Sequence, residues 1–320
     1  RPHQFYTENS IETLLGTEVV SLSTNNKQAI LDTGNMLSYN QLFIATGSRP
    51  RLPKIHGSHL KNVFTLRTID DALKIDSTLH EKAHVIILGS SFLAMEEASY
   101  CVSKSARVTI VIRNLLPLEE TFGEMIGEGI KKWFEAKNVN FIMQSGIRKF
   151  LGNNETVESV ELENGQVVWA DVCVIGIGSK FNTEFLKDSG VILNKKGSID
   201  TNEYLETNIP DVYVGGDIAN SPIFVNEDER ATIGHYAVAQ YHGRIAALNM
   251  LGRKTELKTV PYFSTHLFEH CISYTGHGDA TEVFVDGDVE SFNFVAFYFN
   301  ADSVVVGMAS SQPDKGNFLS

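Results

Sequence analysis

Residues 85–96 read Val85-Ile-Ile-Leu-Gly-Ser-Ser-Phe-Leu-Ala-Met-Glu96, in which an apolar run is followed by a glycine-containing loop and a helical pattern. Four consecutive apolar residues that end at a glycine are typical of a strand buried on both faces of a sheet. The helical pattern continues to Lys104, and a second apolar run follows at 108–112. A strand, a helix and a strand in this order predict a parallel βαβ unit.

The alternation of helices and strands continues along the chain. Helical periodicity predicts a helix over 123–137, whose apolar face contains Ile126, Ile130, Trp133 and Phe134. After it we expect a third strand at 139–143, an antiparallel meander over 146–170 and another strand at 172–175. The fold class that this order predicts is α/β with a parallel sheet.

Two stretches of the sequence, residues 28–47 and residues 159–178, share one pattern. Each predicts a strand, a turn at a glycine, a second strand and then an apolar strand that ends at a glycine. The turn glycines are Gly34 and Gly165, and the terminal glycines are Gly47 and Gly178. The separation is 13 positions in both copies, so we interpret them as one supersecondary unit used twice.

The two copies differ in what precedes them. The glycine loop that starts at Gly89 lies 89 positions before Gly178. The same count back from Gly47 reaches a point about 40 residues before Arg1. We therefore expect this chain to be a fragment of a protein with two dinucleotide-binding domains, whose first glycine loop lies outside the fragment.

The composition limits the classes of function. A length of 320 residues suggests about two domains. The net charge of −12 argues against a nucleic-acid partner, and no apolar run approaches the roughly 18–20 residues of a membrane span. The three cysteines, Cys101, Cys173 and Cys271, form no C-x-x-C pair and no disulfide framework, which favours a reducing compartment.

The loop after the first buried strand has the frame G-x-G-x-x-G/A, filled by Gly89, Ser91 and Ala94. In such loops the first position makes a tight turn, the second lets the backbone approach a pyrophosphate, and the third packs the helix against the strand. Ser91 adds a side chain at the second position. Ile112, followed by Arg113, stands where an acidic residue would bond a ribose hydroxyl.

Three interpretations of this loop remain open. The loop belongs to a Rossmann-like sheet that no longer binds nucleotide well, to an NADP site that uses Arg113, or to a working NAD site. Since Ser91 crowds the pyrophosphate and Ile112 cannot bond a ribose hydroxyl, we expect weak binding of NADH. Ser91→Gly with Ile112→Glu is expected to tighten it, because the two changes restore backbone approach and a hydroxyl–carboxylate bond.

A second segment with chemical meaning runs from Thr207 to Asp217 and ends Val-Tyr-Val-Gly-Gly-Asp. A buried strand delivers Gly215-Gly216-Asp217 to its carboxyl end. The glycines permit a close approach of the backbone, and the Asp217 carboxylate can accept a hydrogen bond from a sugar-like hydroxyl. An ordinary turn is the alternative interpretation.

The order of these motifs resembles that of the FAD-dependent pyridine nucleotide-disulfide oxidoreductase superfamily. Within it, the sequence is most similar to the ferredoxin-reductase branch and to the apoptosis-inducing factor-like proteins. The motifs that carry the resemblance are Ala45-Thr-Gly47, Gly89 to Glu96, Gly176-Ile-Gly178 and Thr207 to Asp217. Further matching segments are 92–96, 170–178, 242–252 and 260–263.

The resemblance implies roles for individual residues. Asp217, with Gly216, would bond the flavin ribitol, Thr46 and Gly47 would contact the FAD, and Glu96 would lie near the nicotinamide as the catalytic residue. The other residues that it assigns to cofactor binding are Gly89, Ser91, Ala94, Arg113, Gly176, Gly178, His235 and Tyr236. The sequence departs from the family at Ser264, where relatives have a tryptophan, and the family's flavin-adjacent lysine would lie before Arg1.

The resemblance also implies an organisation. It predicts two Rossmann-like domains and a C-terminal α+β domain that is incomplete at its end. The expected bounds are 1–68 and 186–252 for the FAD-binding domain, 69–185 for the NAD(P)-binding domain and 253–320 for the C-terminal domain. A long helix is expected over 231–251 and aromatic strands from Pro261 onward.

The function that the resemblance implies is transfer of a hydride from NADH or NADPH to FAD, followed by electron transfer to a protein acceptor such as a ferredoxin or a Rieske-type protein. Two alternatives remain: a degenerate, non-catalytic interaction protein, and a disulfide reductase whose cysteine pair lies outside this chain. We expect no nucleic-acid partner and no membrane span, and a homodimer is compatible with the family. A mitochondrial or cytoplasmic location is expected, with no targeting segment visible.

One motif points elsewhere. His266-Leu-Phe-Glu-His270 matches H-x-x-E-H, a zinc-peptidase pattern that needs both histidines on one helix face. The flanking residues predict strand, and positions four apart along a strand are about 13 Å apart, too far to share one ion. We therefore expect no metal at this motif.

Overall fold

A computed structural model of the chain describes residues 1–320 except 105–106, 154, 225, 259 and 313–320. The chain divides into two compact units. Unit 1 comprises Arg1–Gly47 and Phe181–Lys258, and unit 2 comprises Ser48–Lys180 and Thr259–Ser320. The finer domain bounds expected from the sequence remain predictions.

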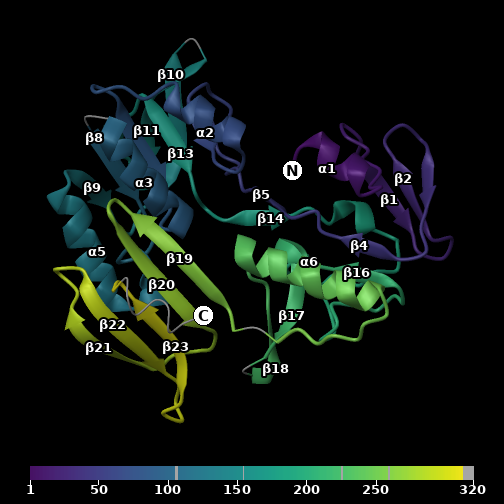
Figure 1. Cartoon of the computed structure of the whole chain (residues 1–320). Helices are drawn as coiled ribbons and strands as arrows, with labels where there is room; N and C mark the ends of the chain where they lie inside the picture. Colours follow the sequence, from purple (N-terminus) through teal and green to yellow (C-terminus); the bar gives the residue numbers. More distant parts are fainter. Residues whose placement is uncertain (105–106, 154, 225, 259, 313–320) are drawn as a thin grey trace. The chain divides into compact units, whose positions relative to one another are not determined.

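Unit 2 is built on a five-stranded parallel sheet, which confirms the α/β prediction (Figure 1). The strand order is β6 (Val63–Thr65), β13 (Val172–Ile175), β7 (His84–Leu88), β8 (Arg107–Val111) and β9 (Val139–Ile142). Helix α3 (Phe92–Lys104) connects β7 to β8, and α4 (Glu119–Phe122) and α5 (Glu124–Ala136) connect β8 to β9. The strand order changes direction beside β7, because β8 lies on one side of it and β13 on the other.

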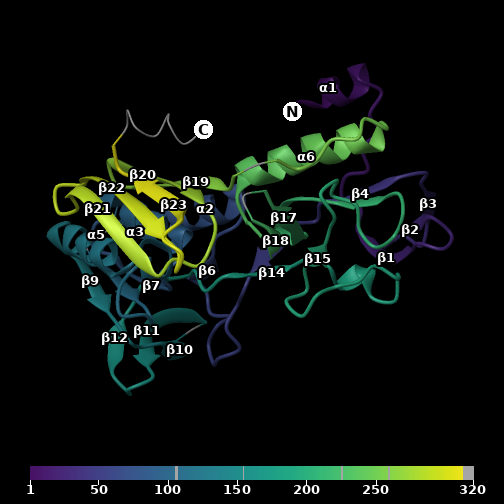
Figure 2. The ribbon, with the colours of Figure 1, turned by 90° about the horizontal axis from the view of Figure 1, so that it is seen from below.

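The two faces of this sheet are covered differently, and alternate residues of β7 show this. Val85 and Ile87 belong to one buried cluster with side chains of α3, α5 and the C-terminal strands. Ile86 and Leu88 belong to another, with side chains of the meander that follows β9. Figure 2 shows the resulting layers of unit 2: the C-terminal sheet, the helices, the parallel sheet and the meander.

The outer layers of unit 2 are antiparallel. The meander contains β10 (Ile147–Asn153), β11 (Thr156–Leu162) and β12 (Val167–Trp169). The C-terminal sheet has the order β19 (Tyr262–Leu267), β20 (His270–Gly276), β23 (Val305–Ser310), β22 (Asn293–Phe299) and β21 (Glu282–Asp288). The predicted antiparallel strands are confirmed, while the helical part of the α+β expectation has no counterpart among the described residues 260–312.

The predicted repeat is confirmed in the backbone. In unit 1, β1 (Val19–Ser23), β2 (Gln28–Leu31) and β3 (Met36–Ser38) form an antiparallel meander that leads into β4 (Leu42–Ile44). In unit 2, β10, β11 and β12 lead into β13 in the same way. The turn glycines have nearly equal left-handed φ angles, 83° at Gly34 and 85° at Gly165, which a side chain would disfavour.

Two neighbouring parallel strands of unit 1, β4 and β16 (Val212–Val214), end at the same edge. Strand β16 pairs in parallel with β4, and α6 (Tyr236–Met250) packs beside the turn that follows β16. The other elements of unit 1 are α1 (His3–Glu8), η1 (Glu184–Leu186), β15 (Ile199–Asp200), η2 (Gly216–Ile218), β17 (Ala219–Ile223) and β18 (Asn226–Ala231).

The predicted helix over 231–251 begins later than expected. Ala231 pairs with Ser221 in the β17–β18 hairpin, so tertiary strand pairing overrides the local helical pattern. The helix starts after His235, whose ring nitrogen accepts a hydrogen bond from the N–H of Ala237 and caps the helix.

Helix α2 (Ile69–Asp76) follows β6. Thr68 caps it, and a capping box links the side chains and backbone N–H groups of Thr68 and Asp71. Strands β5 (Ser48–Pro50) and β14 (Ser179–Phe181) pair with each other. Among the described residues, no helix combines the length and the apolar character that crossing a bilayer requires.

Candidate functional site

A cavity of about 570 Å³ opens at the carboxyl ends of β7, β8 and β13 in unit 2. Its wall includes the loop between β7 and α3, the segment after β8 and the glycine-containing segment 176–178 after β13. In open α/β sheets, ligands bind at this edge where the strand order reverses. The volume lies within the range of about 300–1,000 Å³ that is usual for small-molecule sites.

Glycines bring the walls of this cavity close together. A Cβ on Gly89, whose φ is 119°, would lie 2.3 Å from the carbonyl oxygen of Gly176. A Cβ on Gly176 would lie 2.8 Å from the Cβ of Ala94. The structure therefore unites Gly89, Ala94 and Gly176 in one tight contact, which places the first turn of α3 against the end of β13. The third position of the loop packs helix on strand, as its role in the motif requires.

The Ser91 hydroxyl makes two hydrogen bonds to backbone groups of the protein. It accepts a hydrogen bond from the N–H of Ala94 at 3.2 Å and donates one to the carbonyl oxygen of Gly176 at 3.2 Å. This is the geometry of a helix cap at the residue before α3. The hydroxyl thus reinforces the contact made by the glycines, although Ser91 also lines the cavity.

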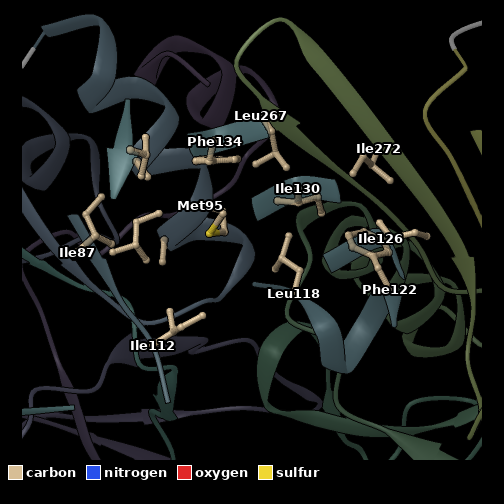
Figure 3. Packing of buried hydrophobic residues seen from close by; sticks show 14 of the residues in the cluster. Ile87, Met95, Ile112, Leu118, Phe122, Ile126, Ile130, Phe134, Leu267 and Ile272 are labelled. Atoms are coloured by element: carbon tan, nitrogen blue, oxygen red, sulfur yellow. The ribbon is translucent and has the colours of Figure 1, made fainter. Parts of the chain in front are cut away.

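The end of β8 differs from what the sequence indicated. Ile112 is 1% exposed, belongs to the buried cluster of unit 2 and does not line the cavity. Figure 3 shows it among the core side chains, below Met95 in this view. Ile112→Glu would bury a carboxylate in this apolar core, so the expectation that it would restore a ribose contact is wrong. Arg113 lines the cavity in its place.

Arg113 forms an ion pair with Glu163, which follows β11. Glu163 is not among the residues that the sequence singled out. Arg113 lies 50 positions away from it, so no local pattern signals their contact.

Glu96 reaches the C-terminal sheet. Its Oε1 accepts hydrogen bonds from the hydroxyl of Thr265 at 2.7 Å and from the N–H of His266 at 3.1 Å. One turn later, the hydroxyl oxygen of Ser99 accepts a bond from the N–H of Phe268. Glu96 is half-buried and is not among the residues that line the cavity. Its position near a nicotinamide remains a prediction, and the contact that the structure shows is with β19.

In unit 1, a buried histidine holds the Gly-Gly-Asp turn. The N–H of Gly216 donates to Nδ1 of His242 on α6 at 3.2 Å. A Cβ on Gly215 would lie 2.6 Å from the ring of Phe43, so the turn packs closely against β4. Burial lowers the pKa of His242 to about 4, which keeps the ring neutral and Nδ1 able to accept. Asp217, next in the chain, is half-exposed.

The other expected flavin contacts lie at strand and helix ends of unit 1. Thr46 donates its hydroxyl to the carbonyl oxygen of Asn182 at 2.7 Å, and the Asn182 amide donates back to the Thr46 carbonyl at 2.9 Å. Gly47 has a left-handed φ of 64°. His235 and Tyr236 stand at the start of α6 with ring centroids 4.6 Å apart, and Tyr236 is 70% exposed.

The H-x-x-E-H motif lies across a hairpin. His266 is on β19 and His270 on β20, so the predicted strand structure is confirmed, although the two residues do not follow one strand as expected. The His270 ring packs at 4.8 Å from both Trp133 and Phe292. Within the described ranges, no group of three or more His, Cys, Asp or Glu side chains is placed to hold a metal.

The cysteines are free thiols rather than a redox pair. Cys101 and Cys173 are buried, and burial raises the pKa of both thiols. Burial also raises the pKa of the partly exposed Cys271. Since the thiolate is the reactive form, these environments do not activate any of the three.

The residues present fit nucleotide cofactors in part. The cavity of unit 2 has the volume, the glycine contact and the helix start that a dinucleotide pyrophosphate needs. In unit 1, the Gly216–Asp217 turn follows β16, which pairs in parallel with β4, and contact of this turn with the ribitol of a flavin remains a prediction. Among the described residues of unit 1, no strand, glycine loop and helix in sequence supplies a second pyrophosphate site.

Comparison with known proteins agrees with this geometry. The chain is 36% identical over 306 residues to apoptosis-inducing factor 3 of Homo sapiens, an alignment that covers 95% of this chain and 50% of that protein. It is 28% identical over 268 residues to rubredoxin-NAD(+) reductase of Pseudomonas putida, covering 83% and 69% of the two chains. The chain thus spans about half the length of the apoptosis-inducing factor 3 proteins that it matches.

Solved structures share the fold. The covalent putidaredoxin reductase–putidaredoxin complex contains a chain that matches with a TM-score of 0.94 and 24% identity, covering 99% of this chain and 77% of that one. The model of the family described as pyridine nucleotide-disulphide oxidoreductase matches residues 3–243. The chain therefore belongs to the pyridine nucleotide-disulphide oxidoreductase family.

Proposed function

We propose that this chain is part of an FAD-dependent oxidoreductase in which NADH or NADPH reduces FAD and the electrons then pass to a protein acceptor. The observation that carries the proposal is the 570 Å³ cavity at the point where the strand order of the parallel sheet reverses, in a chain of this family. FAD, when bound, supplies a group that accepts a hydride and gives up electrons singly. The residues of the chain bind and orient the cofactors.

The nucleotide would lie with its pyrophosphate at the start of α3. The Gly89–Gly176 contact shapes the loop there, and the first N–H groups of a helix together with its dipole favour an anion. Ser91 caps the same helix and keeps the loop in this shape.

The flavin would lie along the strand ends of unit 1. Asp217 would accept a hydrogen bond from the ribitol, and neutral His242 would keep the Gly216–Asp217 turn in position through its Nδ1. Thr46 and Gly47 would lie against the same cofactor, and His235 and Tyr236 at the start of α6 would complete the contact.

The acceptor would be a small electron-transfer protein of the ferredoxin or Rieske type. This is supported by the names of two similar proteins, a rubredoxin reductase and a putidaredoxin reductase bound to putidaredoxin. The three cysteines of the described residues are free thiols, and burial raises the pKa of Cys101 and Cys173, which disfavours a disulfide reductase that uses these cysteines. We further propose a mitochondrial or cytoplasmic location, and we propose that the protein can form a homodimer.

The burial of Ile112 favours a second candidate, a degenerate protein that acts by interaction. Because the β8 end offers no carboxylate, the acceptor that an NAD site usually has at this position is missing from it. Calorimetric titration of the chain with NADH and with NADPH separates the candidates. Binding of either nucleotide supports the oxidoreductase, and no binding of either supports the interaction protein.

The flavin part of the proposal is tested with Asp217. In a longer chain that adds a flavin phosphate loop to these residues, Asp217→Ala should weaken FAD binding roughly 10- to 150-fold, the equivalent of about 1.5–3 kcal/mol. Asp32→Ala, which changes an exposed carboxylate of the same unit, is the matched control. Equal FAD affinity of the Asp217 variant and its parent would show that Asp217 is only a turn residue.

A further inference from the structure

We propose that Glu163 supplies the carboxylate that binds the adenosine ribose, and that the site therefore takes NADH in preference to NADPH. This inference rests on the proposed function, because it assumes that the cavity of unit 2 holds a nicotinamide dinucleotide. The acceptor for the ribose hydroxyl would then come from the hairpin between β11 and β12 and not from the end of β8.

The position of Glu163 is the first step. Gly146 and Arg113 both line the cavity. The Glu163 carboxylate is not itself a lining residue, but it lies against both of them. A Cβ on Gly146 would be 2.7 Å from Nη2 of Arg113 and 2.8 Å from Oε1 of Glu163. The Arg113–Glu163 pair therefore occupies the space over Gly146 at the rim of the cavity, directly after the end of β8.

The backbone fixes Glu163 in this place. Its N–H donates to the carbonyl oxygen of Gly146 at 2.9 Å. The hairpin turn that follows is closed by bonds from the N–H of Gly165 to the Leu162 carbonyl at 3.0 Å and from the N–H of Leu162 to the Gln166 carbonyl at 2.8 Å. A carboxylate on a hydrogen-bonded turn is preorganised for a ligand, in contrast to one on a free loop.

The chemistry of the pair suits a ribose. A ribose 2′-hydroxyl needs an acceptor, which NAD-binding domains usually provide with an acidic side chain after the second strand. Ile112 is buried and provides none. Arg113 engages Oε1 of Glu163, and Oε2 has no partner among the described residues. That oxygen can accept from a ribose hydroxyl while Arg113 holds the carboxylate in position.

The charges at the cavity disfavour an additional phosphate. Among the described residues that line it, Arg113 is the only lysine or arginine, and it is already paired. Glu119 and Glu120 also line the cavity, the first bound to the N–H of Leu116 at 2.8 Å and the second to the amide of Asn114 at 2.9 Å. The 2′-phosphate of NADPH would compete with Glu163 for one guanidinium and would face like charges, which makes its binding unfavourable.

The test is calorimetric titration of NADH and NADPH against the parent chain and three variants. The variants are Glu163→Gln, Arg113→Gln and, as the matched control, Glu158→Gln. Glu158 is an exposed carboxylate on β11 that does not line the cavity. Thermal unfolding by circular dichroism confirms that each variant is folded before titration.

We expect the parent to bind NADH more tightly than NADPH. Glu163→Gln should weaken NADH binding about tenfold and should not weaken NADPH binding, because a carboxylate acceptor and a repulsive charge are removed together. Arg113→Gln should weaken NADH binding less than Glu163→Gln, and the control should leave both affinities unchanged.

Two results would overturn the inference while the proposed function stands. One is tighter binding of NADPH by the parent with loss of that binding in Arg113→Gln, which would make Arg113 a phosphate ligand. The other is NADH affinity that does not change in Glu163→Gln. Failure of the parent to bind either nucleotide would overturn the proposed function itself, and this inference with it.

Discussion

The carboxylate of Glu96 and the hydroxyl of Thr265 are 2.7 Å apart and hydrogen-bonded, which ties helix α3 to strand β19 across 169 positions of sequence. Thr265 is completely buried, so the bond is shielded from water. The residue that the family resemblance places near the nicotinamide is thus also one of the residues that join the helix layer to the C-terminal sheet.

Thr265→Val should lower the free energy of unfolding by about 1.5–3 kcal/mol, because valine has the same shape but cannot donate to the carboxylate. Urea unfolding measures the change. Thr265→Ser, which keeps the donor, should lose less. Thr281→Val, on an exposed threonine whose hydroxyl makes only a 3.4 Å bond, is the matched control and should change stability by less than about 0.5 kcal/mol. Equal effects of the two valine variants would contradict a role for the Glu96 bond.

The next residue of α3 makes stability depend on pH. Glu97 is buried, and burial raises the pKa of its carboxyl above the ordinary value of 4.5, while the thiol of Cys101 lies 3.7 Å from Oε1. Between pH 4.5 and the raised pKa, the unfolded chain has lost this proton and the folded chain keeps it. The contribution of Glu97 to stability is therefore fully present below pH 4.5 and declines as the pH rises through this window.

Glu97→Gln should remove this decline. The variant should be more stable than the parent at neutral pH, because it buries no ionisable carboxyl, and the difference should shrink as the pH falls toward 4.5. Unfolding in urea at several pH values measures the slope. Glu124→Gln, on an exposed position of α5, is the control and should keep the slope of the parent. A slope unchanged in Glu97→Gln would contradict the assignment.

The elements that the sequence predicted well are those that local pattern determines. The apolar runs of β7, β8 and β13 are buried on both faces, and the apolar face of α5 enters the core through Ile126, Ile130 and Phe134. The matched glycine spacing predicted the two meanders because the left-handed turns at Gly34 and Gly165 require that residue type.

The parts that the sequence did not predict depend on tertiary contacts. Helix α6 begins later than predicted because Ala231, which precedes it, pairs with β17. Glu163 and Arg113 are 50 positions apart, and His242 and Gly216 are 26 positions apart, so neither pair has a local signal. The assignment of Ile112 to the ligand side was wrong because residue type alone does not show which side of the strand end faces the core.

The contact between Gly176 and Ala94 predicts a steric sensitivity. In Gly176→Ala, the new Cβ would lie 2.8 Å from the Ala94 Cβ and 3.3 Å from the Ser91 hydroxyl, so α3 must move away from β13. We expect a loss of about 1–3 kcal/mol in unfolding free energy and weaker binding of NADH, since the loop at the helix start moves as well. Thermal unfolding and calorimetry measure the two effects.

The control for this variant is Gly243→Ala in α6. A Cβ at Gly243 meets no atom within 4 Å and the residue lies inside a helix, so alanine should be neutral or stabilise by up to about 1 kcal/mol. If Gly176→Ala is as stable as its parent and binds NADH equally well, the tight contact does not shape the nucleotide loop.

The bond between the N–H of Gly216 and Nδ1 of His242 requires a neutral imidazole, because a protonated ring has no acceptor. Burial lowers the pKa of His242 from 6.5 to about 4. Below pH 6.5 the unfolded chain takes up a proton that the folded chain refuses until the pH nears 4. The contribution of this histidine to stability is thus present above pH 6.5 and is lost as the pH falls toward 4, by an amount on the order of 3 kcal/mol.

NMR titration of the histidine ring protons tests this directly, with the His242 signal assigned by its absence in His242→Asn. We expect the His242 signal to titrate near pH 4, well below the ordinary value of 6.5, because burial penalises the charged ring. His3, exposed in the same unit, is the internal control and serves as the reference signal. Titration of His242 near 6.5 would show that the ring is solvated, and the Gly216–Asp217 turn would then lack the fixed acceptor that we assign to it.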